Sequence, residues 1–194
     1  IADVQLDQLR QRVRGRNPQN SLVSAMIDYI LSGSIRWWRS RDHIEEEKRK
    51  PYHAFMIHYS YLTSIHAEAE ELSKITLDLV QSAFQDIFER DLQIDVSSAL
   101  ETMISDRLIR FNQKSEGIRD NPGPIMTLER LQPYIEMIIE ETKHKRLDSS
   151  GRHRVILDYD TESAQDKVPS AMIVIGGNIL SRGLTIQGLT VSYF

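Results

Sequence analysis

The residues best suited to binding chemistry lie at the end of the sequence, in AMIVIGGNILSRGLTIQGLTVSYF, residues 171–194. The apolar run before Gly176 predicts a buried strand. Gly176 and Gly177 predict a sharp turn, at which a ligand can approach the backbone without meeting a Cβ atom. Asn178 can cap the short helix that follows. The segment is therefore typical of a strand that ends in a ligand-facing loop.

Arg182 follows this turn. Its neighbours are a glycine, Gly183, and two residues with hydroxyl groups, Ser181 and Thr185. A guanidinium at the carboxyl end of a strand can hold a phosphate group through two parallel hydrogen bonds. A purely structural turn is the alternative, and one sequence does not exclude it. We predict that the segment faces phosphate or a nucleic acid.

A second hydroxyl-rich turn follows the apolar run HAFMIHYS, residues 53–60, which predicts another buried strand. A long helix to about residue 90 comes after it. Ser60, Thr63 and Ser64 would then lie between a strand end and a helix N-terminus, a position that suits phosphate oxygens. The alternative, favoured on this segment alone, is that Thr63 or Ser64 only caps the helix.

The elements around these turns are mostly predicted to be helical. Ser21 can cap a helix whose apolar face recurs at helical spacing. Trp37 and Trp38 then precede a run of mixed charge. The two interpretations are that they contact nucleic acid or that they pack the helix onto the domain. Packing is favoured, because acidic residues cancel much of the positive charge. Residues 91–147 are also predicted to be helical.

One of these later helices has an ambiguous start. Thr127 can cap it, but Pro133 lies inside its apolar pattern, so the helix is kinked or begins at the proline. The basic stretch KHKRLDSSGRHR, residues 143–154, is interpreted as a loop, which is either solvated or touches a nucleic-acid backbone. RVILDYD, residues 154–160, predicts a further strand.

Two pairs of side chains are candidate metal ligands. Asp158 and Asp160 form a carboxylate pair, but a turn at a strand end is the favoured interpretation. His66 and Glu70 are four residues apart on the expected helix. Since no third ligand is evident, a solvated or capping pair is favoured. We predict no metal site in the chain.

The composition limits the classes of protein. Of 194 residues, 40% are hydrophobic and 27% charged, which is ordinary for a globular domain. The lack of cysteine excludes disulfides and cysteine-bound zinc, and it fits a cytoplasmic protein. With a formal net charge of −4, contact with nucleic acid must come from a local patch. No apolar run reaches membrane-spanning length, so no membrane partner is expected.

These elements predict a helix-rich α/β fold with a parallel sheet. We expect an N-terminal helical segment over residues 1–50. Residues 51–194 should form the α/β lobe, with a helical insertion over about residues 91–150. The missing initiator Met and the final strand-like residues lead us to expect a fragment of a longer protein, with the lobe truncated at its C-terminus.

The terminal motif resembles a known family. SRGLTIQGLTVSYF is similar to the fifth conserved motif of superfamily-two helicases, which runs Arg-Gly-Leu-Asp-Ile before a strand. GGNILSRGLTIQGLTVSYF resembles more closely the signature of the Z1 domain, a family found in endonuclease-like proteins of bacterial restriction and phage-defence loci. NSLVSAMIDYILSGSIRWWR and HAFMIHYSYLTSIHAE resemble its earlier blocks. The resemblance covers roughly residues 18–90 and 150–194.

This resemblance implies a second RecA-like lobe that faces both DNA and an ATP cleft. Ser181, Arg182 and Gly183 match the Ser/Ala-Arg-Gly element of the motif. Thr185 stands where helicases commonly have aspartate, which puts a role at the ATP ribose or in tethering an arginine finger in doubt. Residues 60–64 correspond loosely to the fourth motif, which grips the nucleic-acid backbone.

The chain lacks the other motifs of such a motor: a glycine-rich phosphate loop with Lys-Ser/Thr, an Asp-Glu metal motif and an arginine-finger motif. The resemblance therefore implies that ATP and Mg²⁺ bind in the full-length parent, and that this chain alone does not hydrolyse ATP and carries no catalytic residue. DNA is the expected partner, with a companion ATPase or another defence-locus protein as a further one. A non-catalytic binding module and a plain nucleotide-binding domain are the alternatives.

Overall fold

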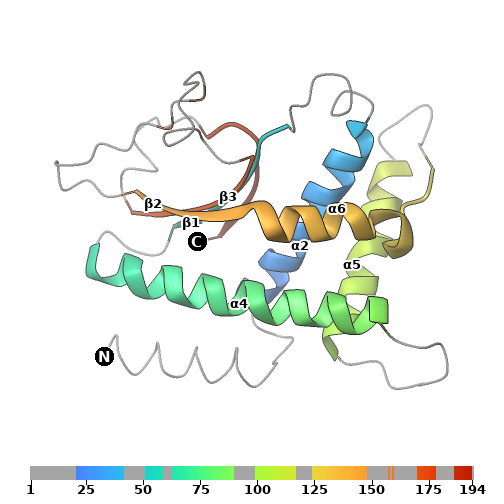
Figure 1. The fold of residues 1–194 in the computed structure, drawn as a ribbon, viewed down its shortest axis with the longest axis horizontal. Coiled ribbons are helices and arrows are strands. Elements are labelled where there is room, and N and C mark those ends of the chain that lie inside the picture. Colours follow the sequence, from blue (N-terminus) through green and yellow to red (C-terminus); the bar gives the residue numbers. More distant parts are fainter. Residues whose placement is uncertain are drawn as a thin grey trace.

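The computed structural model contains an open parallel sheet and a group of helices packed together (Figure 1). The residues that the structure describes are 21–41, 51–58, 63–89, 99–116, 124–147, 157, 159, 170–177 and 186–193.

Four parallel strands form the sheet, in the order β2-β3-β1-β4. Their bounds are His53–His58 for β1, Thr142–Leu147 for β2, Ala171–Gly176 for β3 and Leu189–Tyr193 for β4. The central strands β1 and β3 are those predicted from apolar runs, because a strand covered on both faces needs apolar side chains at successive positions. The predicted α/β class is confirmed, and the parallel sheet is consistent with a RecA-like lobe.

Strand β2 corrects one prediction. Its sequence TKHKRL was expected to be the end of a helical region and the start of a basic loop, yet it pairs with β3 from Thr142 opposite Ala171 to Leu147 opposite Gly176. Only its first and last residues are buried, so β2 is a polar strand at one edge of the described sheet.

The strand predicted over residues 154–160 is not seen at the two described positions. Leu157 and Tyr159 lie outside any strand, and the other residues of that prediction, including Asp158 and Asp160, lie outside the described part of the chain.

The helices are α2 (Ser21–Arg39), α4 (Thr63–Glu89), α5 (Ala99–Glu116) and α6 (Leu128–Glu141). Helix α6 begins at Leu128, because the Thr127 side chain accepts a hydrogen bond from the Arg130 N–H at 3.3 Å. Pro133 lies inside the helix, so the prediction of Thr127 as the cap is confirmed and a start at Pro133 is wrong.

The two faces of the sheet are covered differently. Phe55 and Ile173 point into the larger core, which the sheet shares with all four helices. Met172 and Val174 point to the opposite face, where they pack with Leu157 and neighbouring side chains. Side chains alternate between faces along a strand, so the two cores follow from the register.

Trp37 links helix α2 to the residues that lead into β1. Trp37 is fully buried, and its indole N–H donates a hydrogen bond to the Pro51 carbonyl oxygen at 2.9 Å. The guanidinium of Arg41 lies over the Trp38 ring, 4.3 Å from its centroid. The packing interpretation is confirmed for Trp37. Among the helices described, none has the length and apolar character needed to cross a bilayer.

Candidate nucleic-acid interface at the carboxyl edge of the sheet

The two predicted ligand-facing turns begin side by side. His58, the last residue of β1, is the register partner of Gly176, the last residue of β3. Because the two strands are parallel neighbours, both turns leave from the same edge of the sheet. The ends of β1 and β3 are therefore neighbours in the sheet.

This position is a topological switch point. From β1 the chain proceeds to β2, on the far side of β3, whereas from β3 it proceeds to β4, on the far side of β1. The two connections thus lead in opposite directions along the sheet. In open α/β sheets such a divergence leaves a crevice at the carboxyl edge, and ligands bind there.

Only part of the predicted site lies within the described residues. Gly176 ends β3, and Gly177 follows it and is buried. Thr63 and Ser64 form the first turn of α4, five residues after β1, with the helix N-terminus at this edge. The remaining predicted residues lie outside the described part of the chain: Ser60, Asn178, Ser181, Arg182, Gly183 and Thr185.

The structure adds an arginine that the sequence analysis did not single out. Arg146 and Leu147 end β2, and Leu147 is paired with Gly176. The Arg146 side chain is 47% exposed, so its guanidinium is available to a ligand at the same edge. The sequence analysis predicts a basic loop from residue 143. Leu147, the buried apolar residue at the end of β2, is the feature of the sequence that could have indicated a strand here.

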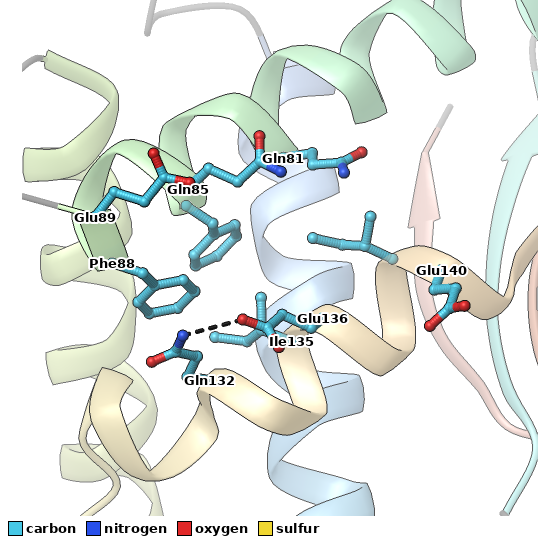
Figure 2. Close-up of a pocket in the computed structure, with 10 residues that line it drawn as sticks. Gln81, Gln85, Phe88, Glu89, Gln132, Ile135, Glu136 and Glu140 are labelled. Carbon is cyan, nitrogen blue, oxygen red and sulfur yellow. Dashed lines mark hydrogen bonds between the residues drawn. The ribbon is translucent and has the colours of Figure 1, made fainter.

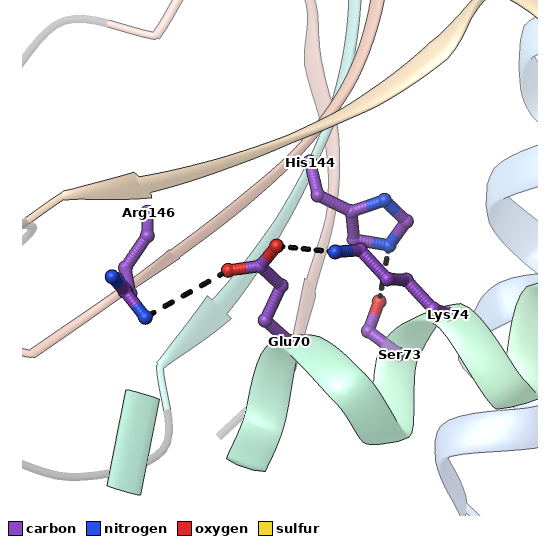
Figure 3. Close-up of polar contacts among 5 residues, drawn as sticks. All are labelled: Glu70, Ser73, Lys74, His144 and Arg146. Atoms are coloured by element: carbon purple, nitrogen blue, oxygen red, sulfur yellow. Dashed lines mark hydrogen bonds and ion pairs between the residues drawn. The ribbon is translucent and has the colours of Figure 1, made fainter. Parts of the chain in front are cut away.

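A polar cluster links the end of β2 to α4 (Figure 3). Glu70 forms an ion pair with Lys74 one turn later, and its other carboxylate oxygen lies 4.0 Å from Arg146. The single carboxylate orients both cations and leaves a net positive charge among the three side chains. Since all three are partly exposed, the cluster contributes mainly to positioning and little to stability.

His144 joins the same cluster without adding charge. Its Nε2 lies 3.1 Å from the hydroxyl of Ser73, which is fully buried on α4. Burial, reinforced by the positive charge of Lys74, lowers the pKa of His144 to about 4. The imidazole is therefore neutral at neutral pH, and it anchors β2 to α4.

The charge of β2 supports two interpretations. Lys143, Lys145 and Arg146 place three cations in one short strand that contains no acid. Cations on an edge strand discourage pairing with other chains. They also add positive charge along this edge strand, with Lys143 and Lys145 on one face and Arg146 on the other, and a chain of net charge −4 needs such a local source in order to contact nucleic acid.

Of the candidate metal ligands, His66 and Glu70 lie within the described residues. His66 is only 3% exposed, so the interpretation of His66 and Glu70 as a solvated pair is wrong for the histidine, and Glu70 instead binds the two cations described above. Within the described ranges no group of three His, Asp or Glu side chains is placed to hold a metal ion.

Comparison with known proteins gave one match. Neither the curated proteins nor the solved structures yielded a match to the chain. The family description that matches is "Z1 domain", and it covers residues 21–194, which is most of the sequence and includes every strand and helix described here. The chain therefore belongs to the Z1 domain family.

Proposed function

We propose that this chain is the second RecA-like lobe of an ATP-dependent, helicase-like DNA-processing protein of bacterial restriction or phage defence, which acts in the cytoplasm. In this proposal the carboxyl edge of the sheet contacts the DNA backbone. The chain binds DNA, and the longer parent protein performs the hydrolysis.

The observation that supports this proposal most is the pairing of His58 with Gly176 at the switch point. The strands that precede the segment with Arg182 and the hydroxyl-rich turn therefore end at a common edge, where a phosphate-binding surface could form. Arg146, at the end of the adjacent strand β2, adds an exposed cation to that edge.

The contacts expected there are electrostatic and independent of base sequence. Guanidinium and ammonium groups would bind phosphate oxygens, and backbone N–H groups at the start of α4 would donate to others. ATP and Mg²⁺ belong to the longer parent in this proposal, and we assign them no ligand among the described residues.

The test of the motor role is Arg182→Ala in the full-length parent. The substitution removes the guanidinium of the Gly-Arg segment, so DNA-stimulated ATP hydrolysis should fall by at least tenfold. Unchanged ATPase activity together with unchanged DNA binding would show that this segment serves neither function.

The second candidate is a non-catalytic DNA- or partner-binding module with a degenerate RecA-like fold. Thr185 favours it, because helicases commonly have aspartate at that position. Thr185→Asp in the full-length parent distinguishes the two candidates. A motor that has kept this surface should retain or gain ATPase activity, whereas a binding module should show none before or after the change.

A further inference from the structure

A groove of about 420 Å³ lies between α4 and α6, away from the carboxyl edge of the sheet (Figure 2). Its floor is apolar, with Phe84 and Ile135 buried and with Phe88 and Ile139 partly exposed. The rings of Phe84 and Phe88 lie nearly parallel, with centroids 6.1 Å apart. Apolar surface at the base of a groove between two helices is available to a partner side chain.

The rim of this groove is acidic. Glu89 ends α4, and Glu136 and Glu140 lie one turn apart on α6, all three with exposed side chains. The Gln132 amide donates a hydrogen bond to a Glu136 carboxylate oxygen at 3.0 Å, which orients that carboxylate along the rim. None of the side chains that line the groove is basic. The groove therefore presents negative charge above an apolar floor.

We propose that this groove is the docking site for a basic amphipathic helix of a partner protein. A helix can insert apolar side chains at positions i, i+3, i+4 and i+7 between α4 and α6. Lysine and arginine on its flanks can cover the aromatic floor with their methylene stems and reach the glutamates with their charged ends. The volume is within the roughly 300–1,000 Å³ of established ligand pockets, which leaves room for several side chains.

The acidic rim decides between possible occupants. A nucleic acid would be repelled by three carboxylates with no neighbouring cation in the lining. An acidic helix would be repelled in the same way. The site is also separate from the proposed DNA surface, because the groove uses the last turns of α4 whereas the carboxyl edge adjoins its first turn. Failure of either proposal thus leaves the other intact.

The test uses the full chain and a labelled synthetic helical peptide of leucine and lysine, with leucines at the i, i+3, i+4 and i+7 positions. Fluorescence anisotropy should show saturable binding that weakens as salt rises. E136Q/E140Q removes two rim charges from exposed positions, and it should weaken binding about tenfold. Phe88→Ala removes a partly exposed aromatic ring from the floor and should weaken peptide binding at least tenfold.

Glu129→Gln is the matched control, because it removes an exposed carboxylate from the first turn of α6 outside the groove. It should leave the affinity unchanged. Equal binding of a peptide with glutamate in place of lysine, or equal weakening by Glu129→Gln, would contradict the proposal. Displacement of the peptide by spermine alone would assign the groove to a small polycation. Self-association that E136Q/E140Q abolishes would assign it to a second copy of the chain, and either result would overturn the proposal.

Discussion

The imidazole of His53 stacks on the phenol ring of Tyr29, with ring centroids 4.6 Å apart, and its Nε2 donates a hydrogen bond to the Tyr29 carbonyl oxygen at 2.8 Å. On its other side Nδ1 lies 3.3 Å from the Thr190 hydroxyl. One fully buried side chain therefore joins α2, β1 and β4. This junction supports the strand that leads to the candidate interface, and it has consequences for stability.

The first prediction concerns pH. Burial lowers the pKa of His53 to about 4, below its ordinary value of 6.5. As the pH falls below 6.5 the unfolded chain binds a proton that the folded chain does not, so the free energy of unfolding falls until about pH 4. We expect this residue to account for a loss of roughly 2 kcal/mol between about pH 7 and about pH 5.

Urea unfolding of the wild type and His53→Gln at these two pH values measures this effect. The variant is expected to be less stable at neutral pH, but it should lose less stability on acidification. His144, whose pKa is also lowered to about 4, should account for part of the remaining slope. An equal loss in the wild type and the variant would show that His53 does not titrate as the fold requires.

The second prediction concerns Gly33 on α2. A Cβ atom at this position would lie 2.5 Å from His53 Cδ2 and 2.9 Å from Ile138 Cδ1. The stack on Tyr29 and the contacts of both ring nitrogens hold His53 in place, so Gly33→Ala should lower the free energy of unfolding by about 1–3 kcal/mol. At an exposed helical site the same change would stabilise the protein by up to about 1 kcal/mol.

A double-mutant cycle with His53→Ala isolates this contact. Most of the cost of Gly33→Ala should disappear once the imidazole is absent, because the remaining close contact is with Ile138 Cδ1, the end of a flexible side chain. If the effects of the two changes on the free energy of unfolding are additive, the contact with His53 does not cause the destabilisation by Gly33→Ala.

The third prediction concerns Gly188, which precedes β4. Its φ is +72°, and a Cβ atom there would lie 1.9 Å from the Tyr52 carbonyl oxygen. This clash is with backbone, and the Gly188 carbonyl also accepts a hydrogen bond from the Ala54 N–H at 2.9 Å. Gly188→Ala should therefore destabilise the protein by at least about 2 kcal/mol.

Gly188→Asn separates the two causes, since asparagine tolerates positive φ but still carries a Cβ atom. Thermal melts should show that asparagine is as harmful as alanine. Substantial recovery with asparagine would mean that backbone strain, rather than close approach to Tyr52, makes glycine necessary.

The sequence predicted the buried strands β1 and β3 and also the largely exposed strand β4, but it missed the polar strand β2. β1 and β3 are continuous apolar runs, a pattern that only a covered parallel strand requires. TKHKRL carries no such pattern, because β2 lies at an edge and its extended conformation is imposed by pairing with β3. Local sequence does not encode that pairing.

The candidate site was likewise predicted in part from the sequence. Glycines and an arginine after a strand indicated the turn at Gly176, and apolar length indicated the neighbouring strand that ends at His58. The place of Arg146 beside them depends on strand order, which brings residues distant in sequence to one edge. The burial of His66 was not predicted, because a histidine fits either face of an amphipathic helix.

If the carboxyl edge of the sheet binds the phosphate backbone, DNA binding must depend on salt through the cations at that edge. Arg146→Gln removes the exposed cation at the edge. Arg130→Gln is the control, since Arg130 is exposed in the first turn of α6, at the opposite end of that helix from β2. Full-chain protein and a short duplex are titrated over a range of salt concentrations for the wild type and both variants.

The affinity should fall as salt rises, and Arg146→Gln should reduce the slope of log K against log salt by about 1, since one phosphate contact is lost. Arg130→Gln should leave the slope unchanged. A flat salt response of the wild type, or the same slope in all three proteins, would contradict the claim that the carboxyl edge of the sheet is a DNA-backbone surface.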